Sequence, residues 1–151
     1  MGLYLGSSEK LKIITPSGFW NLIIYSQNPI TNGIMYAIHN GAHVINVSIG
    51  PNFNGLDILP IQDQEYIART QFKNEEIVWK HIINVANEHN AIIVFAAGND
   101  NILANIPPEN RTNKTLNVAA VDRQIKGTEF TNYGLGSNIS APGKDIASSV
   151  P

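Results

Sequence analysis

The sequence contains no cysteine, little charge and no long apolar run, and each absence excludes a class of protein. Without cysteine the chain forms no disulfide, builds no thiolate zinc site and offers no cysteine nucleophile. Only 15% of its 151 residues are charged and the net charge is -2, so it has no basic stripe to bind nucleic acid. No apolar stretch approaches the roughly 20 residues that span a bilayer, so we expect no membrane partner.

The composition fits one globular domain. Hydrophobic residues make up 43% of the chain, and the length suits a single domain of about 100–200 residues. Extensive disorder is not expected, because disordered chains combine high net charge with few apolar residues. The low charge also suggests that part of the surface is covered by something outside this sequence.

Helices and strands alternate along the sequence. Asn74 is a suitable N-cap for the second helix, and residues 51–73 are expected to be irregular. The alternation predicts an α/β fold of three layers, with a mostly parallel sheet and helices on both faces. The expected helices cover residues 30–40 and 74–88, and the expected strands cover 11–15, 44–48, 91–97 and 116–121, with shorter pieces at 129–131 and 138–140.

Small residues follow two of the expected strands, at Ser48-Ile49-Gly50 and Gly98-Asn99-Asp100. In open parallel sheets, ligands bind just past the carboxyl ends of the strands. Small residues at such ends let a backbone or a ligand approach closely. The sequence therefore predicts a binding site at these two bends.

Segments around these bends resemble the subtilisin-like serine proteases (subtilase family, peptidase S8), in the order in which that family carries them. The resemblance covers roughly residues 11–50 and 77–151. It implies a subtilisin-like fold and hydrolysis of peptide bonds, in which a histidine base activates a serine and an aspartate orients the histidine. The segments are 32–38 with 41–50, then 94–100, then 118–122, and then 130–134 with 139–146.

The resemblance also implies roles for individual residues. Asn99 matches the asparagine whose side-chain amide stabilises the oxyanion, a role that suits a donor that does not ionise. The alternative is that Asn99 only caps a turn, and that the small residues only pack at a buried strand end. The residues that match the substrate-binding segments are Ser48, Ile49, Gly50, Ala96, Ala97 and Gly98.

No member of the catalytic triad matches. The sequence contains no Asp-Thr-Gly or Asp-Ser-Gly, and no Gly-Thr-Ser-Met-Ala. None of its histidines lies in a His-Gly-Thr-His pattern, so we expect surface or capping roles for them. The four histidines are His39, His43, His81 and His89.

We therefore expect residues 1–151 to be a central part of a catalytic domain that is inactive alone. Its partners would be the N- and C-terminal parts of the same domain and a peptide or protein substrate. No metal site or cofactor is expected in this chain, and the resemblance leaves calcium open for the complete domain.

Residues 51–75 depart from the family pattern as an insertion. Long loops in compact domains are often functional or disordered. Two interpretations are equally supported: the insertion shapes specificity beside the substrate channel, or it is a solvated excursion.

Two rival functions remain. The first is a non-catalytic peptide-binding or scaffold module with a protease-like fold. The second is a nucleotide-binding α/β domain, which would require a glycine-rich phosphate loop after a first strand, and the sequence has none.

Overall fold

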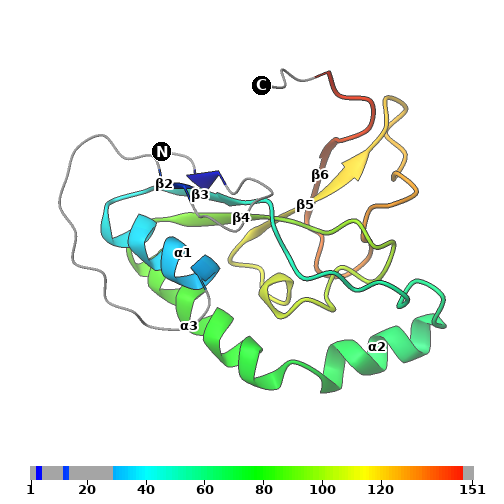
Figure 1. The fold of residues 1–151 in the computed structure, drawn as a ribbon, viewed down its shortest axis with the longest axis horizontal. Helices are drawn as coiled ribbons and strands as arrows, with labels where there is room; N and C mark the ends of the chain where they lie inside the picture. The colour runs from blue at the N-terminus through cyan, green and yellow to red at the C-terminus, as the bar shows by residue number, and fades with distance from the viewer. Residues whose placement is uncertain (1–2, 5–11, 14–28, 148–151) are drawn as a thin grey trace.

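The computed structural model describes residues 3–4, 12–13 and 29–147 (Figure 1). Two short strands, β1 (Leu3–Tyr4) and β2 (Lys12–Ile13), pair in antiparallel fashion. The remainder of the strand expected at residues 11–15 lies outside the described residues. No helix among the described residues is long and apolar enough to cross a membrane.

Four parallel strands form the main sheet, in the order β3-β4-β5-β6. Val47 lies opposite Phe95, and Ala96 lies opposite Val118, so neighbouring strands end at the same edge. The predicted mostly parallel sheet is therefore confirmed. The strands are β3 (Val44–Val47), β4 (Ile92–Ala96), β5 (Leu116–Val121) and β6 (Ile139–Pro142).

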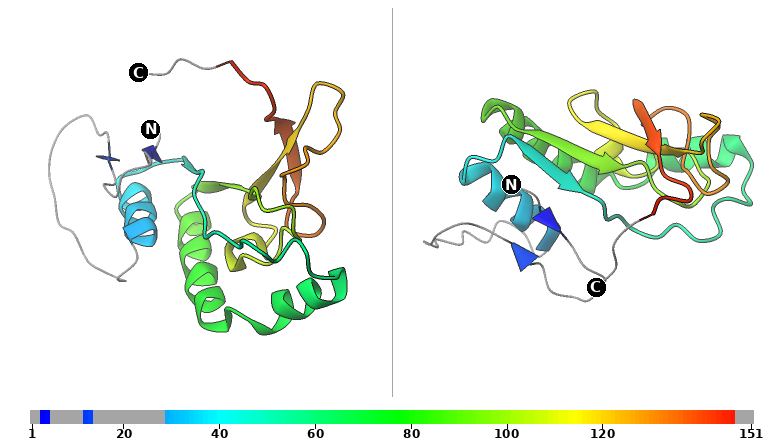
Figure 2. Two further views of the ribbon diagram at one scale, coloured as in Figure 1. Left: turned by 45° about the vertical axis from the view of Figure 1, so that its right-hand side comes forward. Right: turned by 90° about the horizontal axis from the view of Figure 1, so that it is seen from above.

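Two helices, α1 (Pro29–His39) and α3 (Lys73–Glu88), pack side by side against one face of the sheet (Figures 1 and 2). Alternate residues of β3 and β4 point toward these helices, because successive side chains of a strand point to opposite faces. Burial of this apolar surface is the main favourable contribution to folding. The core contains Ile34 and Ile38 from α1, Ile82, Ile83 and Ala86 from α3, and Ile45, Val47, Ile93 and Phe95 from the strands.

The opposite face of the sheet is open in the described part of the molecule. Val44 at 54% and Ile139 at 47% relative exposure lie on it, together with the half-exposed Ile92 and Leu116. Parallel sheets normally have both faces covered. The described residues therefore form an incomplete version of the expected three-layer α/β fold.

Two local expectations are wrong. Helix α3 begins after Phe72, which is in the left-handed region with φ 61° and makes no side-chain cap, so Asn74 lies inside the helix and is not its N-cap. Residues 129–131 form no strand. The Thr131 hydroxyl instead accepts a hydrogen bond from the Ala120 N–H at 2.9 Å, so a side chain takes the place of a ladder partner.

The insertion at residues 51–75 also differs from the expected irregular chain, because helix α2 (Ile61–Thr70) forms within it. Gln64 of α2 is only 2% exposed. Its amide donates to the Leu56 and Leu59 carbonyls at 3.2 and 3.1 Å, and its oxygen accepts from the Leu103 N–H at 2.9 Å. Ala68 packs in a cluster with Ile102 and Ile106. Gln64 and Ala68 therefore anchor this segment to the domain.

Replacing Gln64 with alanine should reduce the free energy of unfolding by about 1–3 kcal/mol, because buried polar backbone groups lose their partners. Gln62→Ala on the same helix is the matched control, because Gln62 is exposed, and its effect should stay within about 0.5 kcal/mol. Urea unfolding of both variants measures the difference, and equal effects would contradict the anchoring role.

Candidate active site

The bends after β3 and β4 open into one cavity of about 220 Å³. Because these strands are adjacent and parallel, the chain leaves both at the same edge of the sheet. An engineered cavity of about 150 Å³ holds a benzene molecule, so this cavity is large enough for an amino-acid side chain. It is lined by every expected site residue, namely Ser48, Ile49, Gly50, Ala96, Ala97, Gly98 and Asn99.

Asn99 lies at the exposed rim of this cavity. Among the described residues no hydrogen bond engages its side chain, so the amide caps no turn in this part of the structure. An amide has two N–H donors and a carbonyl acceptor. Those of Asn99 are therefore available to a molecule in the cavity.

The bend that carries Asn99 is held by the side chain of Asn132, which is 0% exposed. The Asn132 amide nitrogen donates to the Ala97 carbonyl at 3.0 Å. Its oxygen accepts from the backbone N–H groups of Asp100 at 2.9 Å and Ile102 at 3.3 Å. The Asn132 N–H also donates to the Gly98 carbonyl at 3.0 Å. One side chain thus satisfies buried backbone groups on both sides of Asn99.

Gly98 is required at this bend for two reasons. Its φ of 113° is a conformation that residues with a Cβ rarely adopt. A Cβ at this position would also overlap the amide nitrogen of Asn132. Sequence reasoning assigned no role to Asn132, because its partners lie 30 to 35 residues away along the chain and no local pattern announces them.

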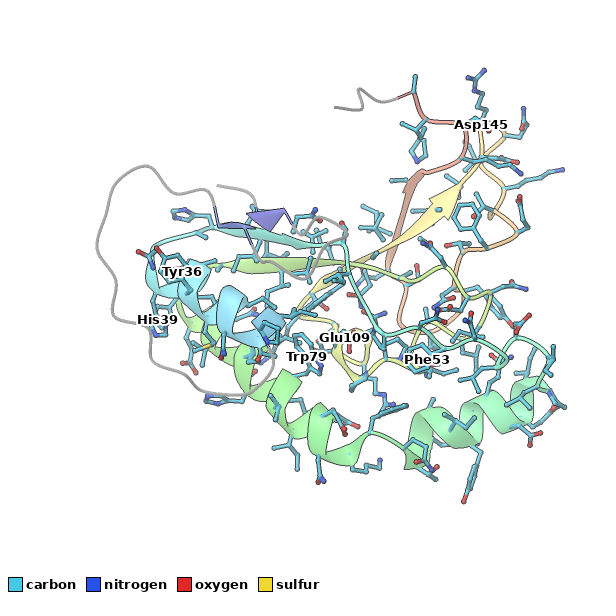
Figure 3. All side chains as sticks on the ribbon, viewed as in Figure 1. Tyr36, His39, Phe53, Trp79, Glu109 and Asp145 are labelled. Atoms are coloured by element: carbon cyan, nitrogen blue, oxygen red, sulfur yellow. The ribbon has the colours of Figure 1, made fainter. Side chains whose placement is uncertain are left out.

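Two acidic residues line the cavity, at different depths. Asp100 is partly exposed, whereas Glu109 of the short 3-10 helix η1 (Pro108–Asn110) is only 7% exposed (Figure 3). Burial raises the pKa of the Glu109 carboxyl, and a hydrogen bond from its own backbone N–H and the charge of Arg111 offset this only in part. Beside Glu109, the Oδ1 atom of Asn110 is buried without a hydrogen-bond partner. Sequence reasoning did not identify Glu109 or Asn110.

No lysine, arginine or histidine is among the described residues that line this cavity. The nearby Arg111 is directed to α3, where its Nη1 lies 2.8 Å from Glu76 Oε2. Its Nη2 donates to the Ile106 carbonyl at 2.7 Å. The cavity therefore has carboxyl groups in its lining and no cation to balance them.

The histidines lie elsewhere. His39 Nδ1 is 2.8 Å from the Met35 carbonyl and His89 Nδ1 is 2.9 Å from the Val85 carbonyl, so both occupy the last turns of helices or their ends. His43 and His81 are exposed. The described residues contain no group of three side chains that could hold a metal ion. No described residue at the cavity has the chemistry of a nucleophile paired with a histidine base.

The fold and the paired bends define a parallel α/β protein with a site at the strand ends. The chain belongs to the subtilase family, whose model matches residues 4–150, and this is a family of serine peptidases. It is 33% identical over 146 residues to the cell wall-associated protease of Bacillus subtilis (strain 168), covering 97% of this chain and 14% of that protein. It is 28% identical over 121 residues to a thermophilic serine proteinase of Bacillus sp. (strain AK1), covering 80% of this chain and 25% of that protein.

A solved structure shows the same relationship. The prenylagaramide maturation protease PagA aligns with a TM-score of 0.59 and 27% identity, over 81% of this chain and 39% of that one. The chain therefore spans only a minor part of the proteins it resembles.

Replacing Gly98 with alanine should lower the free energy of unfolding by at least about 1–3 kcal/mol, because the new Cβ imposes a strained backbone and displaces Asn132. The matched control is Gly50→Ala, because a Cβ at Gly50 meets no atom within 4 Å. Urea unfolding should show a large loss for the first variant and a small change for the second. Similar values for both would contradict the tight bend at Gly98.

Burial of Glu109 predicts a pH dependence of stability. A carboxyl whose pKa is raised by folding holds its proton more tightly in the folded state, so stability falls as pH rises from its ordinary pKa of 4.5 through the folded value. Glu109→Gln removes the buried charge and should be more stable than the natural protein at pH 7. This advantage should shrink as pH falls toward 4.5. Thermal unfolding of both proteins across this range measures it, and a constant difference would contradict the effect of burial.

Proposed function

We propose that this chain is the central part of the catalytic domain of a subtilisin-like serine endopeptidase. In the complete domain it supplies the oxyanion donor and the walls of the substrate channel. The observation that carries the proposal is a cavity that both bends share, with the unengaged amide of Asn99 at its rim. The family membership supports the reaction class.

Asn99 is the proposed oxyanion donor. When a nucleophile attacks a peptide carbonyl, negative charge develops on the carbonyl oxygen, and a preorganised N–H donor stabilises the transition state more than the ground state. The Asn132 contacts on both sides of Asn99 support such preorganisation, because they fix the backbone before substrate arrives. An amide also keeps its donors at every pH at which the enzyme works.

The segments at Ser48-Ile49-Gly50 and Ala96-Ala97-Gly98 are the proposed substrate walls. Both follow parallel strands and line the cavity, so an extended peptide can lie between them. Main-chain hydrogen bonds to such a peptide give affinity with little sequence demand. Gly50 leaves space beside it, because no atom lies within 4 Å of where a Cβ would be.

The nucleophile, its histidine base and the orienting aspartate would come from polypeptide outside this chain. The open apolar face of the sheet supports this, because a further layer is needed to cover it. We therefore propose that the 151-residue chain alone shows no serine-inhibitor-sensitive cleavage of a generic peptide. We propose no cofactor for this chain, and we propose a calcium site only for the complete domain.

The second candidate is a peptide-binding or scaffold module without catalysis, in which the same cavity would hold a peptide that is not cleaved. The gene sequence beyond Pro151 distinguishes the two functions. A serine in a Gly-Thr-Ser context soon after Pro151 supports the peptidase, whereas a stop codon there supports the scaffold.

Asn99→Ala in the complete gene product should lower kcat by about 10²–10³ while KM changes little, because the lost interaction forms only in the transition state. This magnitude is that known for such a donor in the subtilisin family and is not read from this structure. Steady-state kinetics with a chromogenic peptide measures it. The matched control is Asn113→Ala, an exposed asparagine outside the cavity lining, which should leave both constants unchanged. An unchanged kcat in Asn99→Ala would remove Asn99 from the mechanism.

A further inference from the structure

The cavity beside Asn99 has an unusual lining for a pocket that receives a side chain from a peptide. Its apolar walls include Ile49, Phe53, Ala97 and Pro107. Its polar groups at depth are acceptors, because Glu109 is 7% exposed and Asn110 is 2% exposed, whereas Asp100 is nearer the rim. The cavity thus combines apolar walls with two acidic residues in its lining.

These oxygen-bearing groups differ in their partners, and the Glu109 carboxyl accepts a hydrogen bond from its own backbone N–H. No ion pair engages Glu109 or Asp100 among the described residues, and the buried Oδ1 of Asn110 accepts no hydrogen bond. The amide nitrogen of Asn110 is already committed, since it donates to the Ala104 carbonyl at 3.0 Å. The Oδ1 of Asn110 is enclosed by protein atoms, so the charged acceptors that the cavity offers to a donor from elsewhere are the two carboxyl groups.

The nearest cation cannot be that donor. Arg111 follows Asn110 directly, but its guanidinium is occupied by Glu76 and by the carbonyls of Asn105 and Ile106. These contacts hold it on the α3 side of the chain, outside the cavity lining. The two carboxyl groups of the cavity are therefore left for a ligand.

We infer that this cavity binds a lysine or arginine side chain of the peptide, with the cationic group beside the carboxyl groups of Glu109 and Asp100. The methylene stem lies along the apolar walls, as stems of such side chains commonly do. A lysine ammonium has three donors and an arginine guanidinium has five, and neither has an acceptor, which suits a lining of acceptors. A bound metal ion is less well matched, because calcium takes six to eight oxygen ligands and the described residues have no group of three acidic or histidine ligands.

What this inference implies for cleavage rests on the proposed function. Asn99 lines the same cavity, so the residue whose carbonyl faces its amide places its own side chain in the cavity. The complete enzyme therefore prefers a basic residue immediately before the bond that it cleaves.

Binding and turnover can be measured separately, using peptides that differ at one position. The binding probes are acetyl-Ala-Ala-Lys-amide and acetyl-Ala-Ala-norleucine-amide, which share an apolar stem and differ in the ammonium group, titrated into the 151-residue chain by NMR. The turnover probes are chromogenic substrates with the same sequences, assayed with the complete gene product. We expect the lysine peptide to bind and to react about ten- to hundredfold better than the norleucine peptide, which is the range for a hydrogen-bonded charge.

Three variants locate the preference. Glu109→Gln and Asp100→Asn should each reduce the lysine preference about tenfold or more and leave the norleucine peptide unchanged. Asp100 is partly exposed, so its variant remains informative where Glu109→Gln disturbs folding. Glu75→Gln removes one exposed negative charge on α3, outside the cavity, and should change neither peptide.

The outcomes distinguish the two proposals. Turnover of both substrates with no lysine preference overturns the basic pocket and leaves the peptidase intact. Lysine-selective binding that is lost in Glu109→Gln or Asp100→Asn, without turnover of any peptide by the complete gene product, supports the pocket and overturns the peptidase. If the lysine peptide does not bind and no substrate is turned over, both the basic pocket and the peptidase are overturned.

Discussion

The site depends on one buried side chain, that of Asn132. Its amide bonds to the Ala97 carbonyl and to the Asp100 N–H, and it occupies the space that a Cβ at Gly98 would need. Chain segments that are more than 30 residues apart are thereby locked together. Asn99 projects from the bend between these contacts, so the position of its backbone is set by the fold. The proposed oxyanion role would benefit from such a fixed backbone, because a donor positioned in advance needs little reorganisation during reaction.

The parallel sheet places this bend at the edge where β3 and β4 both end. Strands β3 and β4 are paired in register and end together, so the small residues after each reach one cavity. The hydrophobic contacts of α1 and α3 secure one face of these strands, whereas no described residue covers the apolar groups on the other face. The insertion completes the cavity from outside: Gln64 fixes its loop and Phe53 contributes to the wall. Packing therefore determines where the site lies, and the polar contacts determine its shape.

Much of the fold could be predicted from the sequence, because apolar runs such as residues 92–96 and the helical spacing before them are local signals. The proximity of Gly50 and Asn99 could also be predicted from the sequence, since parallel strands end at a common edge. Helix α2 was missed because its stability comes from contacts of Gln64 and Ala68 with the distant residues 102–106. Glu109 and Asn132 were missed for the same reason: their burial and partners are made by tertiary structure, which no local pattern encodes.

A crystal structure of the complete gene product with a bound peptide aldehyde tests the central claim most directly. The account predicts that the Asn99 amide nitrogen lies about 2.7–3.1 Å from the oxygen of the bound aldehyde carbon. It also predicts that the Asn132 side chain still joins Ala97 to Asp100 beneath it. An Asn99 amide directed away from that oxygen, or a peptide bound at another edge of the sheet, would contradict the account.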